Sequence, residues 1–301
     1  MVSGPPSHAT PGQDQTLFSI RPLSSIDDFR RAEILQRDIW GITDDIEIVP
    51  KDVMLIVQKN GGLALGAFNH TNEMIGVLFG FLGRTVDGQW KHCSHMLGVL
   101  PSYRKSGAGE ALKVFQREYV RKQGLDLITW TVNPLEGINA SLNFGKLGVV
   151  CRQYFPNFYG EMDDGLNRGL PSDRFEVEWW INSPRVEKRL GQKEARQGLP
   201  AVLRSGAQSA NRTVLKDGFR MPLDLNLDLN SPGLLFEVPA DYQAIKSHSM
   251  NNALLWIAHS RMVFETCFKN GYVVTEFFSE TDPLERRNYF VLKRDLAKIL
   301  G

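Results

Sequence analysis

The stretch that most constrains the fold is residues 91–124, which read as a strand, a glycine turn and a helix. Residues 92–100 are short, mostly apolar and followed by Pro101, which predicts a buried strand of a central sheet. Beyond the turn, apolar residues recur at helical spacing until Gly124 ends the pattern, and they are Ala111, Leu112, Phe115 and Tyr119. The sequence therefore predicts an α/β core.

The turn between this strand and this helix is also a candidate anion site. The first turn of a helix presents N–H groups that have no partner in the helix, together with the positive end of its dipole. Gly107 and Gly109 would let a ligand approach the backbone, and Arg104 and Lys105 add positive charge. A turn that serves packing alone is the alternative, but it leaves the two basic residues unexplained. We expect a diphosphate here.

Composition narrows the class of partner. The chain has 301 residues, of which 42% are hydrophobic and 10% aromatic, as is ordinary for a soluble enzyme with a real core. Its 35 basic and 34 acidic residues give a net charge of +1, so no overall field attracts nucleic acid or an acidic membrane. A small-molecule partner fits better.

The cysteines and the apolar runs bear on compartment and metal. Cys93, Cys151 and Cys267 are odd in number, far apart and in no CxxC pair, which argues against a disulfide framework and against a zinc site. The longest apolar run, 74–83, is too short to span a bilayer, and the polar amino end lacks the core of a signal peptide. We expect a cytoplasmic protein without a metal.

The chain from the amino end to residue 182 alternates strands and helices. Residues 1–16 are polar and are expected to be disordered. Periodicity and turn residues predict the remaining elements. The expected strands are 17–23, 63–68, 73–84, 92–100, 125–132, 149–159 and 174–181, and the expected helices are 25–40, 50–58, 110–123 and 139–147.

This arrangement resembles the GNAT acyl-CoA N-acyltransferases, and two motifs carry the resemblance. The family's acyl-CoA motif, Arg/Gln-x-x-Gly-x-Gly/Ala between the fourth strand and the next helix, is matched by Arg104, Lys105, Ser106, Gly107, Ala108 and Gly109. The second motif, an Asn at a strand end and a helix that closes with Lys-Leu-Gly, is matched by Asn133, Asn139, Lys146, Leu147 and Gly148. The resemblance implies a mixed, splayed sheet whose parallel strands separate to admit CoA.

The resemblance implies which residues of this chain would bind the cofactor. The backbone of the fourth strand would line the acyl group, and the glycine motif and the second motif would hold the rest of the cofactor. The cofactor-binding residues implied are Leu97, Gly98, Val99, Arg104, Lys105, Ser106, Gly107, Ala108, Gly109, Asn133, Asn139 and Phe144. The implied cofactor is acetyl-CoA, with succinyl-CoA as the alternative, because a longer branch of the superfamily with extra carboxyl-terminal residues is associated with N-succinylation.

The implied reaction needs a base for the amine and an acid for the departing thiolate. His95 is the candidate base, since strand alternation places it on the same face as Leu97 and Val99, with His92 on the opposite face in a structural role. A histidine satisfied by a neighbour is the alternative. Many GNAT enzymes place a Tyr acid where this chain has Phe144, so the acid would be Tyr154 or Tyr159, or the thiolate leaves unassisted.

The loop at residues 157–174 is the expected acceptor site. It mixes aromatic, amide, acidic and basic groups, which suits a small zwitterion, and Arg174 or Arg168 could pair with a substrate carboxylate as a fork. A structural pair of Asp173 with Arg174, or a solvated loop, is the alternative. The substrate-binding candidates are Asn167, Asp173 and Arg174.

The carboxyl-terminal third repeats part of this pattern without the glycine motif. We expect a charged helix at 185–196, a polar linker at 208–230, a strand at 233–238, one long helix at 242–269 and strands at 272–278 and 289–292. That order is typical of the second half of a GNAT fold. The expected division is therefore a tail (1–16), a catalytic domain (17–182), a helix with linker (183–230) and a degenerate half-GNAT subdomain (231–301) that walls the acceptor pocket.

These features predict an N-acyltransferase that moves an acetyl or succinyl group from CoA to a small-molecule amine, such as an amino acid. The alternative function is a non-catalytic acyl-CoA sensor, which the phenylalanine at 144 favours. The expected partners are acyl-CoA and the amine, with neither nucleic acid nor membrane, and monomer and homodimer remain equally open.

Overall fold

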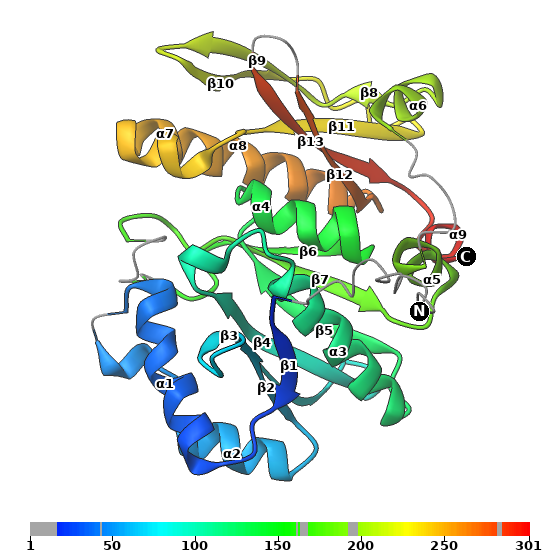
Figure 1. The fold of residues 1–301 in the computed structure, drawn as a ribbon. Coiled ribbons are helices and arrows are strands. Elements are labelled where there is room, and N and C mark those ends of the chain that lie inside the picture. Colours follow the sequence, from blue (N-terminus) through cyan, green and yellow to red (C-terminus); the bar gives the residue numbers. More distant parts are fainter. Residues whose placement is uncertain (1–16, 43, 161, 163–167, 192–197, 282–284) are drawn as a thin grey trace, which may run out of the picture.

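The computed structural model describes residues 17–42, 44–160, 162, 168–191, 198–281 and 285–301 (Figure 1). The expected disordered tail, 1–16, lies outside these residues. The described helices are α1 (Ile26–Trp40), α2 (Lys51–Lys59), α3 (Ala108–Lys122), α4 (Gly137–Ala140), α5 (Pro184–Leu190), α6 (Leu199–Arg204), α7 (Tyr242–His248), α8 (Met250–Lys269) and α9 (Leu296–Leu300), with short helical turns at Asp45–Glu47 (η1) and Pro101–Tyr103 (η2) and a π-helical segment at Ser141–Leu147 (η3).

The strands form one large mixed sheet and one hairpin. They are β1 (Ser19–Pro22), β2 (Leu63–Phe68), β3 (Met74–Arg84), β4 (Trp90–Val99), β5 (Leu127–Val132), β6 (Val150–Phe155), β7 (Arg174–Trp180), β8 (Gln208–Ser209), β9 (Asn211–Lys216), β10 (Phe219–Leu225), β11 (Gly233–Val238), β12 (Val273–Thr281) and β13 (Arg286–Lys293). Within the described residues the sheet order is β1-β2-β3-β4-β5-β7-β6-β12-β13-β11-β8, and β9 pairs with β10.

The middle of the sheet opens between its parallel strands β4 and β5. β4 pairs with β3 along its whole length, from Trp90 to Val99. It pairs with β5 only at His92↔Ile128 and Cys93↔Thr129, after which the two strands part. This separation confirms the splayed, mixed sheet that the family resemblance implied.

Helices cover both faces of the amino-terminal strands, as Figure 1 shows. The helices α1 and α2 bury Phe29 and Met54 against Val77 and Phe79 of β3. On the opposite face, α3 buries Ala108 and Leu112 against β2 and β3. Each helix presents one apolar stripe, so this part of the sheet is sandwiched between α1 and α2 on one face and α3 on the other.

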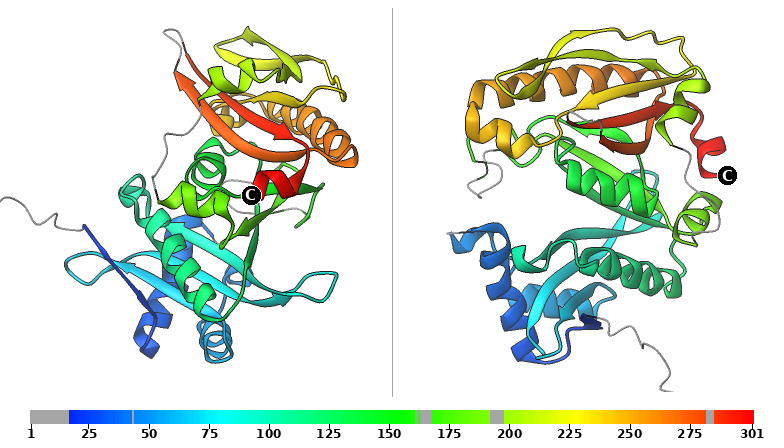
Figure 2. Two further views of the ribbon diagram at one scale, coloured as in Figure 1. Left: turned by 90° about the vertical axis from the view of Figure 1, so that its right-hand side faces the viewer. Right: turned by 45° about the horizontal axis from the view of Figure 1, so that its top comes forward.

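The carboxyl-terminal half repeats the strand order of the region that precedes it. The order β5-β7-β6 continues as β12-β13-β11, so each half consists of a strand, a helical segment and two further strands placed in the same way about the β6–β12 junction. The short β8 runs parallel to β11, as β4 does to β5. This arrangement is the half-copy that the sequence order suggested, and Figure 2 shows it stacked beside the amino-terminal half in both views.

Two stretches differ from the sequence-based expectation. Residues 208–230 are not a featureless linker, because β9 and β10 form a hairpin through Asp217 and Gly218, which both have positive φ (51° and 81°). The expected helix at 242–269 is two helices, because Ser249 has extended backbone (φ −156°) and its side chain accepts a hydrogen bond from the Asn252 N–H as the cap of α8.

An aromatic cluster joins the two halves. Phe290 of β13 lies 5.5 Å from Phe144 of η3 and 5.7 Å from Phe175 of β7, measured between ring centroids. Phe264 of α8 lies 4.5 Å from Phe175 in a perpendicular arrangement. These rings belong to one continuous buried core, so the carboxyl-terminal half is packed onto the first and not tethered beside it.

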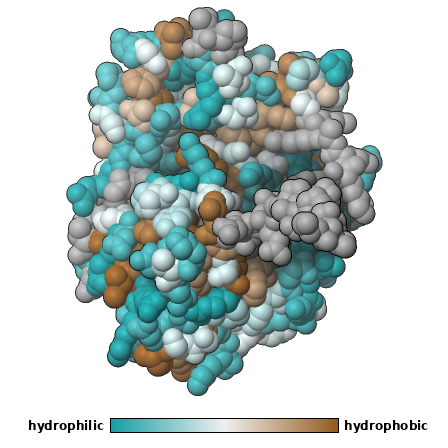
Figure 3. Space-filling view, in the orientation of Figure 1, coloured by the Kyte–Doolittle hydropathy of each residue, from teal (hydrophilic) through white to brown (hydrophobic). Residues whose placement is uncertain are grey.

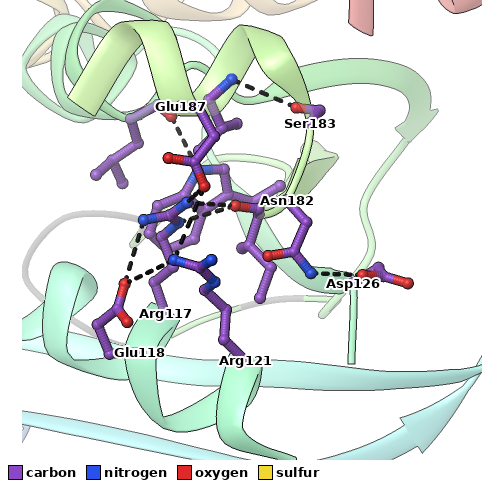
Figure 4. A network of polar contacts seen from close by, with 11 residues as sticks. Arg117, Glu118, Arg121, Asp126, Asn182, Ser183 and Glu187 are labelled. Carbon is purple, nitrogen blue, oxygen red and sulfur yellow. Dashed lines mark hydrogen bonds and ion pairs between the residues drawn. The ribbon is translucent and has the colours of Figure 1, made fainter. Parts of the chain in front are cut away.

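A polar network fixes the segment that leads into the second half (Figure 4). The buried Arg117 of α3 donates two hydrogen bonds to the carbonyl of Ile181, at 2.9 and 2.7 Å, and one to Glu187 of α5 at 2.5 Å. It thereby anchors the chain that follows β7.

The surface of the molecule is mixed in character. Hydrophilic residues predominate on the face in Figure 3, with apolar residues in scattered small areas.

Candidate active site

The site begins with a bulge in β4 at His95. Phe79 of β3 pairs with Met96 and Gly80 pairs with Ser94, so His95 is the extra residue that no residue of β3 opposes. The bulge lies just beyond the last β4–β5 pair, at Cys93. A bulge of this kind disrupts the ladder and re-aims side chains, here at the point where the two strands part.

His95 faces a pocket of about 480 Å³ on the α1–α2 side of the sheet. Its ring lies 6.1 Å from those of Phe79 and Phe81, and its side chain remains accessible. Most of the other lining residues are apolar, and the pocket includes Ile46, Glu47, Ile48, Val49, Pro50, Val53 and Val57. These walls displace water and lower the pKa of His95, so the imidazole is neutral at neutral pH.

The bulge corrects one sequence-based expectation. His95 was expected on the same face as Leu97 and Val99, but those two side chains pack against the α3 side. Simple alternation fails here because the extra residue shifts the strand's phase by one. His92 has the structural position that was expected, since it is fully buried on the α3 side beneath Lys113.

Across the opening, polar groups that the sequence did not single out lie on the same face as His95. The Thr131 hydroxyl of β5 is 2.7 Å from the hydroxyl of Tyr159. Thr131 is the register partner of Glu176, which forms an ion pair with Lys91 at 3.0 Å. The alternation of Thr129 and Thr131 with apolar residues was the available sequence signal, but only the register of β5 with β7 shows which groups Thr131 meets.

The glycine turn before α3 has the geometry of an anion site. Gly107 caps the helix with φ +90°, and a Cβ added there would meet no atom within 4 Å, so the space in front is open. Among the described residues, no acceptor receives the N–H groups of Gly107 and Gly109, whereas that of Ala108 reaches the Ser106 hydroxyl at 3.3 Å. Arg104 and Lys105 are exposed beside them.

The second motif is only partly available to a ligand. Asn139 is exposed, and Asn133 accepts a hydrogen bond from the N–H of Leu135 at 2.9 Å. Phe144, expected among the cofactor contacts, has no exposed surface, because the ring packs against Phe175 and Phe290. The carboxyl-terminal half therefore occupies the place that a ligand would need in order to touch Phe144.

Two of the expected site residues, Tyr154 and Asp173, are held in buried contacts. The Tyr154 hydroxyl donates to Asp173 at 2.6 Å and its ring stacks on Phe264, and burial, followed by the hydrogen bond to Asp173, raises its pKa. Such a phenol is a poor acid. Burial would raise the pKa of Asp173, but hydrogen bonds from Arg261 and Tyr154 outweigh it and the pKa is lowered. Asp173 is thus fully engaged and almost wholly buried.

Arg174 and Asn167 complete the expected acceptor residues. Arg174 is buried and donates to the carbonyl of Asp173 at 2.9 Å and to the sulfur of Met162 at 3.3 Å, so it holds the loop from beneath. Asn167 lies outside the described residues. Tyr159, by contrast, is 45% exposed and stays beside the opening.

Two kinds of feature are absent from the described residues. No group of three or more His, Cys, Asp or Glu side chains in the described ranges is placed to hold a metal ion. In the same ranges, no helix combines the length and the apolar character that crossing a membrane requires.

This chain has the GNAT fold. Its parallel strands β4 and β5 separate, α3 begins at a glycine cap, and a helical segment follows β5. No family model matches the sequence, and no curated protein matches it. Among solved structures, the ribosomal-protein-S18-alanine N-acetyltransferase from Escherichia coli is 16% identical, with a TM-score of 0.42 over 55% of this chain and 94% of that chain.

Two other solved structures are similar to the same extent. An acetyltransferase of the GNAT family from Streptococcus pneumoniae is 14% identical, with a TM-score of 0.43 over 54% of this chain and 98% of that one. Arabidopsis thaliana NAA60, in complex with a bisubstrate analogue, is 20% identical, with a TM-score of 0.43 over 55% of this chain and 99% of that one. The fold assignment rests on the strand order and register of this chain itself.

Proposed function

We propose that this protein is an acyl-CoA-dependent N-acyltransferase that moves an acetyl group, or alternatively a succinyl group, from CoA to the amine of a small molecule. One observation carries the proposal: the opening between β4 and β5 connects the free N–H groups before α3 with a neutral, accessible histidine at the β4 bulge. That path joins an anion site to a base, as transfer from CoA requires.

The cofactor would bind along this path. The diphosphate would accept hydrogen bonds from the turn Arg104–Gly109, where the helix dipole and two cations favour negative charge. The pantetheine would lie in the opening, where Leu97, Gly98 and Val99 of β4 have no partner on β5 among the described residues. Asn133 and Asn139 stand at the far side of that opening.

The reaction would proceed by direct attack on the thioester. His95 takes a proton from the substrate ammonium, and the free amine forms a C–N bond with the carbonyl carbon. Backbone N–H groups of β4 that are released from the ladder would stabilise the resulting oxyanion. As the C–S bond breaks, Tyr159, which is hydrogen-bonded to Thr131, gives its proton to the CoA thiolate, and the nitrogen loses its second proton, which restores the Tyr159 phenol.

The acceptor would enter from the α1–α2 side. The pocket at His95 is mostly apolar and carries Glu47 at its edge, which suits an amine with an apolar body, such as an amino acid with an aliphatic or aromatic side chain. The loop 157–174 contributes Tyr159 to this arrangement, while Asp173 and Arg174 support the loop from within. Residues 17–182 would form the catalytic unit, with 231–301 as its supporting wall.

Release of free thiol tests the proposal. Acetyl-CoA and succinyl-CoA are each incubated with the full chain and with a panel of L- and D-amino acids, polyamines, arylalkylamines and a peptide with a free amino terminus. Amine-dependent thiol release is the expected result. If calorimetry shows that CoA binds but no acceptor releases thiol, the protein is an acyl-CoA sensor. If CoA does not bind at all, neither the acyltransferase nor the sensor proposal holds.

A further inference from the structure

A second large concavity lies away from the opening between β4 and β5. This groove, of about 1260 Å³, runs between α3 and η3 on one side and α5, β12, β13 and α9 on the other. Its described lining contains eight Lys or Arg residues and two Glu residues. Because the whole chain is almost neutral at +1, that excess of positive charge is gathered locally.

The floor of the groove carries more positive charge than its acid compensates. Arg185 and Arg189 of α5 both donate to the same oxygen of Glu276 on β12, at 2.9 and 2.6 Å. Their side chains are 12% and 15% exposed, and that of Glu276 is 15% exposed. Both arginines also donate to carbonyls at the end of η3, so they are held rigidly with their charge directed inward.

The rim adds three lysine side chains that are either unpaired among the described residues or held in surface ion pairs. Lys293, the last residue of β13, forms no ion pair or side-chain hydrogen bond with any described residue. Among the described residues, Lys298 of α9 pairs with the exposed Asp295 alone, and Lys146 of η3 pairs with the partly exposed Glu110 at 2.6 Å. Surface pairs of this kind contribute about 1 kcal/mol or less, so a more highly charged anion can replace them.

We propose that this groove is a binding site for a small polyphosphate, meaning a ligand with two or more linked phosphate groups. A concave wall concentrates the field of its cations, and a polyphosphate is the small-molecule anion whose charge density best matches the local excess. Guanidinium and ammonium donors both bind phosphate oxygens. None of residues 104–109 lines the groove, so it does not include the glycine turn of the proposed CoA diphosphate site, although Glu110 and Lys146 line the groove beside that site.

The location of the groove predicts that a bound ligand would stabilise the contact between the two halves. The cations come from η3 of the amino-terminal half, from the connecting helix α5, and from β13 and α9 of the carboxyl-terminal half. A bound polyphosphate would therefore bridge the seam and stabilise the folded chain, since binding to the native state alone raises stability by mass action. The inference does not depend on the proposed catalytic activity.

Calorimetric titration with sodium tripolyphosphate tests the site. The full chain is titrated at low salt with its CoA site saturated by CoA, and one tripolyphosphate per chain is expected to bind. The variant Lys293→Glu/Lys298→Glu is expected to lose at least about tenfold in affinity, equivalent to about 1.4 kcal/mol. The matched variant Lys216→Glu/Lys269→Glu, with the same charge change at exposed positions elsewhere, is expected to stay within about twofold.

Three outcomes would overturn the proposal. They are the absence of saturable binding to the wild-type chain, loss of binding when CoA saturates its own site, and an equal loss in both double variants. A parallel titration with ATP separates two sources of the same chemistry. Equal affinities for tripolyphosphate and ATP mean that the groove contacts phosphate groups alone. Tighter binding of ATP means that the groove also contacts the nucleoside.

Discussion

His95 owes its position to a single extra residue in β4, and its proposed role can be tested through pH. His95→Gln is expected to lower kcat/KM about 100-fold, the range of general-base catalysis, with the largest loss at low pH where the amine is protonated. Because burial lowers the pKa of His95, wild-type activity should fall only when the pH drops below the usual range for histidine. Thiol-release kinetics from pH 5 to 9 measure this.

The control for this variant is His70→Gln, which changes an exposed histidine in the β2–β3 turn. It is expected to leave the pH profile unchanged. A His95→Gln enzyme with the wild-type profile would remove His95 from the reaction.

The two tyrosines of the acceptor region should respond to hydroxyl removal in opposite ways. Tyr159→Phe is expected to lower kcat at least tenfold without changing the melting temperature, since the residue is 45% exposed. Tyr154→Phe is expected to destabilise the fold by about 1–3 kcal/mol, because Asp173 loses a buried donor. Turnover and urea unfolding of both variants distinguish the roles, and the reverse pattern would exchange them.

His92 makes stability depend on pH. Both ring nitrogens are buried without a partner among the described residues, and burial, followed by the charge of Lys113, lowers the pKa from 6.5 to about 4. Between these values the unfolded chain binds the proton and the folded chain does not, so stability should fall by about 3 kcal/mol as the pH drops from 6.5 to 4.

Urea unfolding at pH 7.5 and 4.5 measures this slope in the wild type and in His92→Leu, in which most of it should disappear. An exposed histidine gives the comparison, and His70→Leu should keep the wild-type slope. If His92→Leu also keeps the wild-type slope, the acid sensitivity arises elsewhere.

At the scale of elements, substitutions of glycine distinguish the cost of backbone strain from the loss of ligand contact in the turn before α3. Gly107 and Gly88 have φ of +90° and +80°, and a Cβ on either would meet no atom within 4 Å. Gly107→Val and Gly88→Val should therefore destabilise the fold equally, by about 1–2 kcal/mol. Only Gly107→Val should abolish CoA binding in calorimetry, and retained binding would place the diphosphate elsewhere.

The sequence predicted most elements because their patterns are local. The β4–turn–α3 unit, the β2–β3 hairpin and the second-motif helix follow from apolar spacing, glycines and prolines, which act over a few residues. The Asp217-Gly218 turn of the β9–β10 hairpin carried a recognisable signal that the polarity of its strands concealed. The bulge at His95 had none, because a bulge is a mismatch between two strands and each strand alone looks regular.

The candidate site was predictable to a similar extent. The glycine motif was readable because consecutive residues form it, whereas the face of His95 was wrong because of the bulge. The buried contacts of Tyr154 and Asp173 could not be predicted because their partners, Phe264 and Arg261, come from a helix about 110 and 88 residues further along the chain. Thr131 and Glu176 were missed because they meet only through the register of β5 with β7.

At the scale of the whole molecule, the aromatic seam should make the halves unfold together. Phe290→Ala removes a fully buried ring that contacts Phe144, Phe175 and Phe264, and a cost of about 3–5 kcal/mol is expected. Hydrogen exchange followed by mass spectrometry should show protection falling by the same factor in β3 and in β12. A loss confined to β12 would mean that the halves are independent folding units.

The β6–β12 junction also decides where the sheet ends. In a core that stopped at β7, the six-residue β6 would be an open edge able to recruit a strand from another molecule. Here β12 pairs with β6 at Val274↔Cys151, and the sheet terminates instead in β1, four residues long and ending in Pro22, and in β8, only two residues long. The carboxyl-terminal half thus leaves only short strands at the ends of the sheet, and short edge strands offer little backbone to a second molecule.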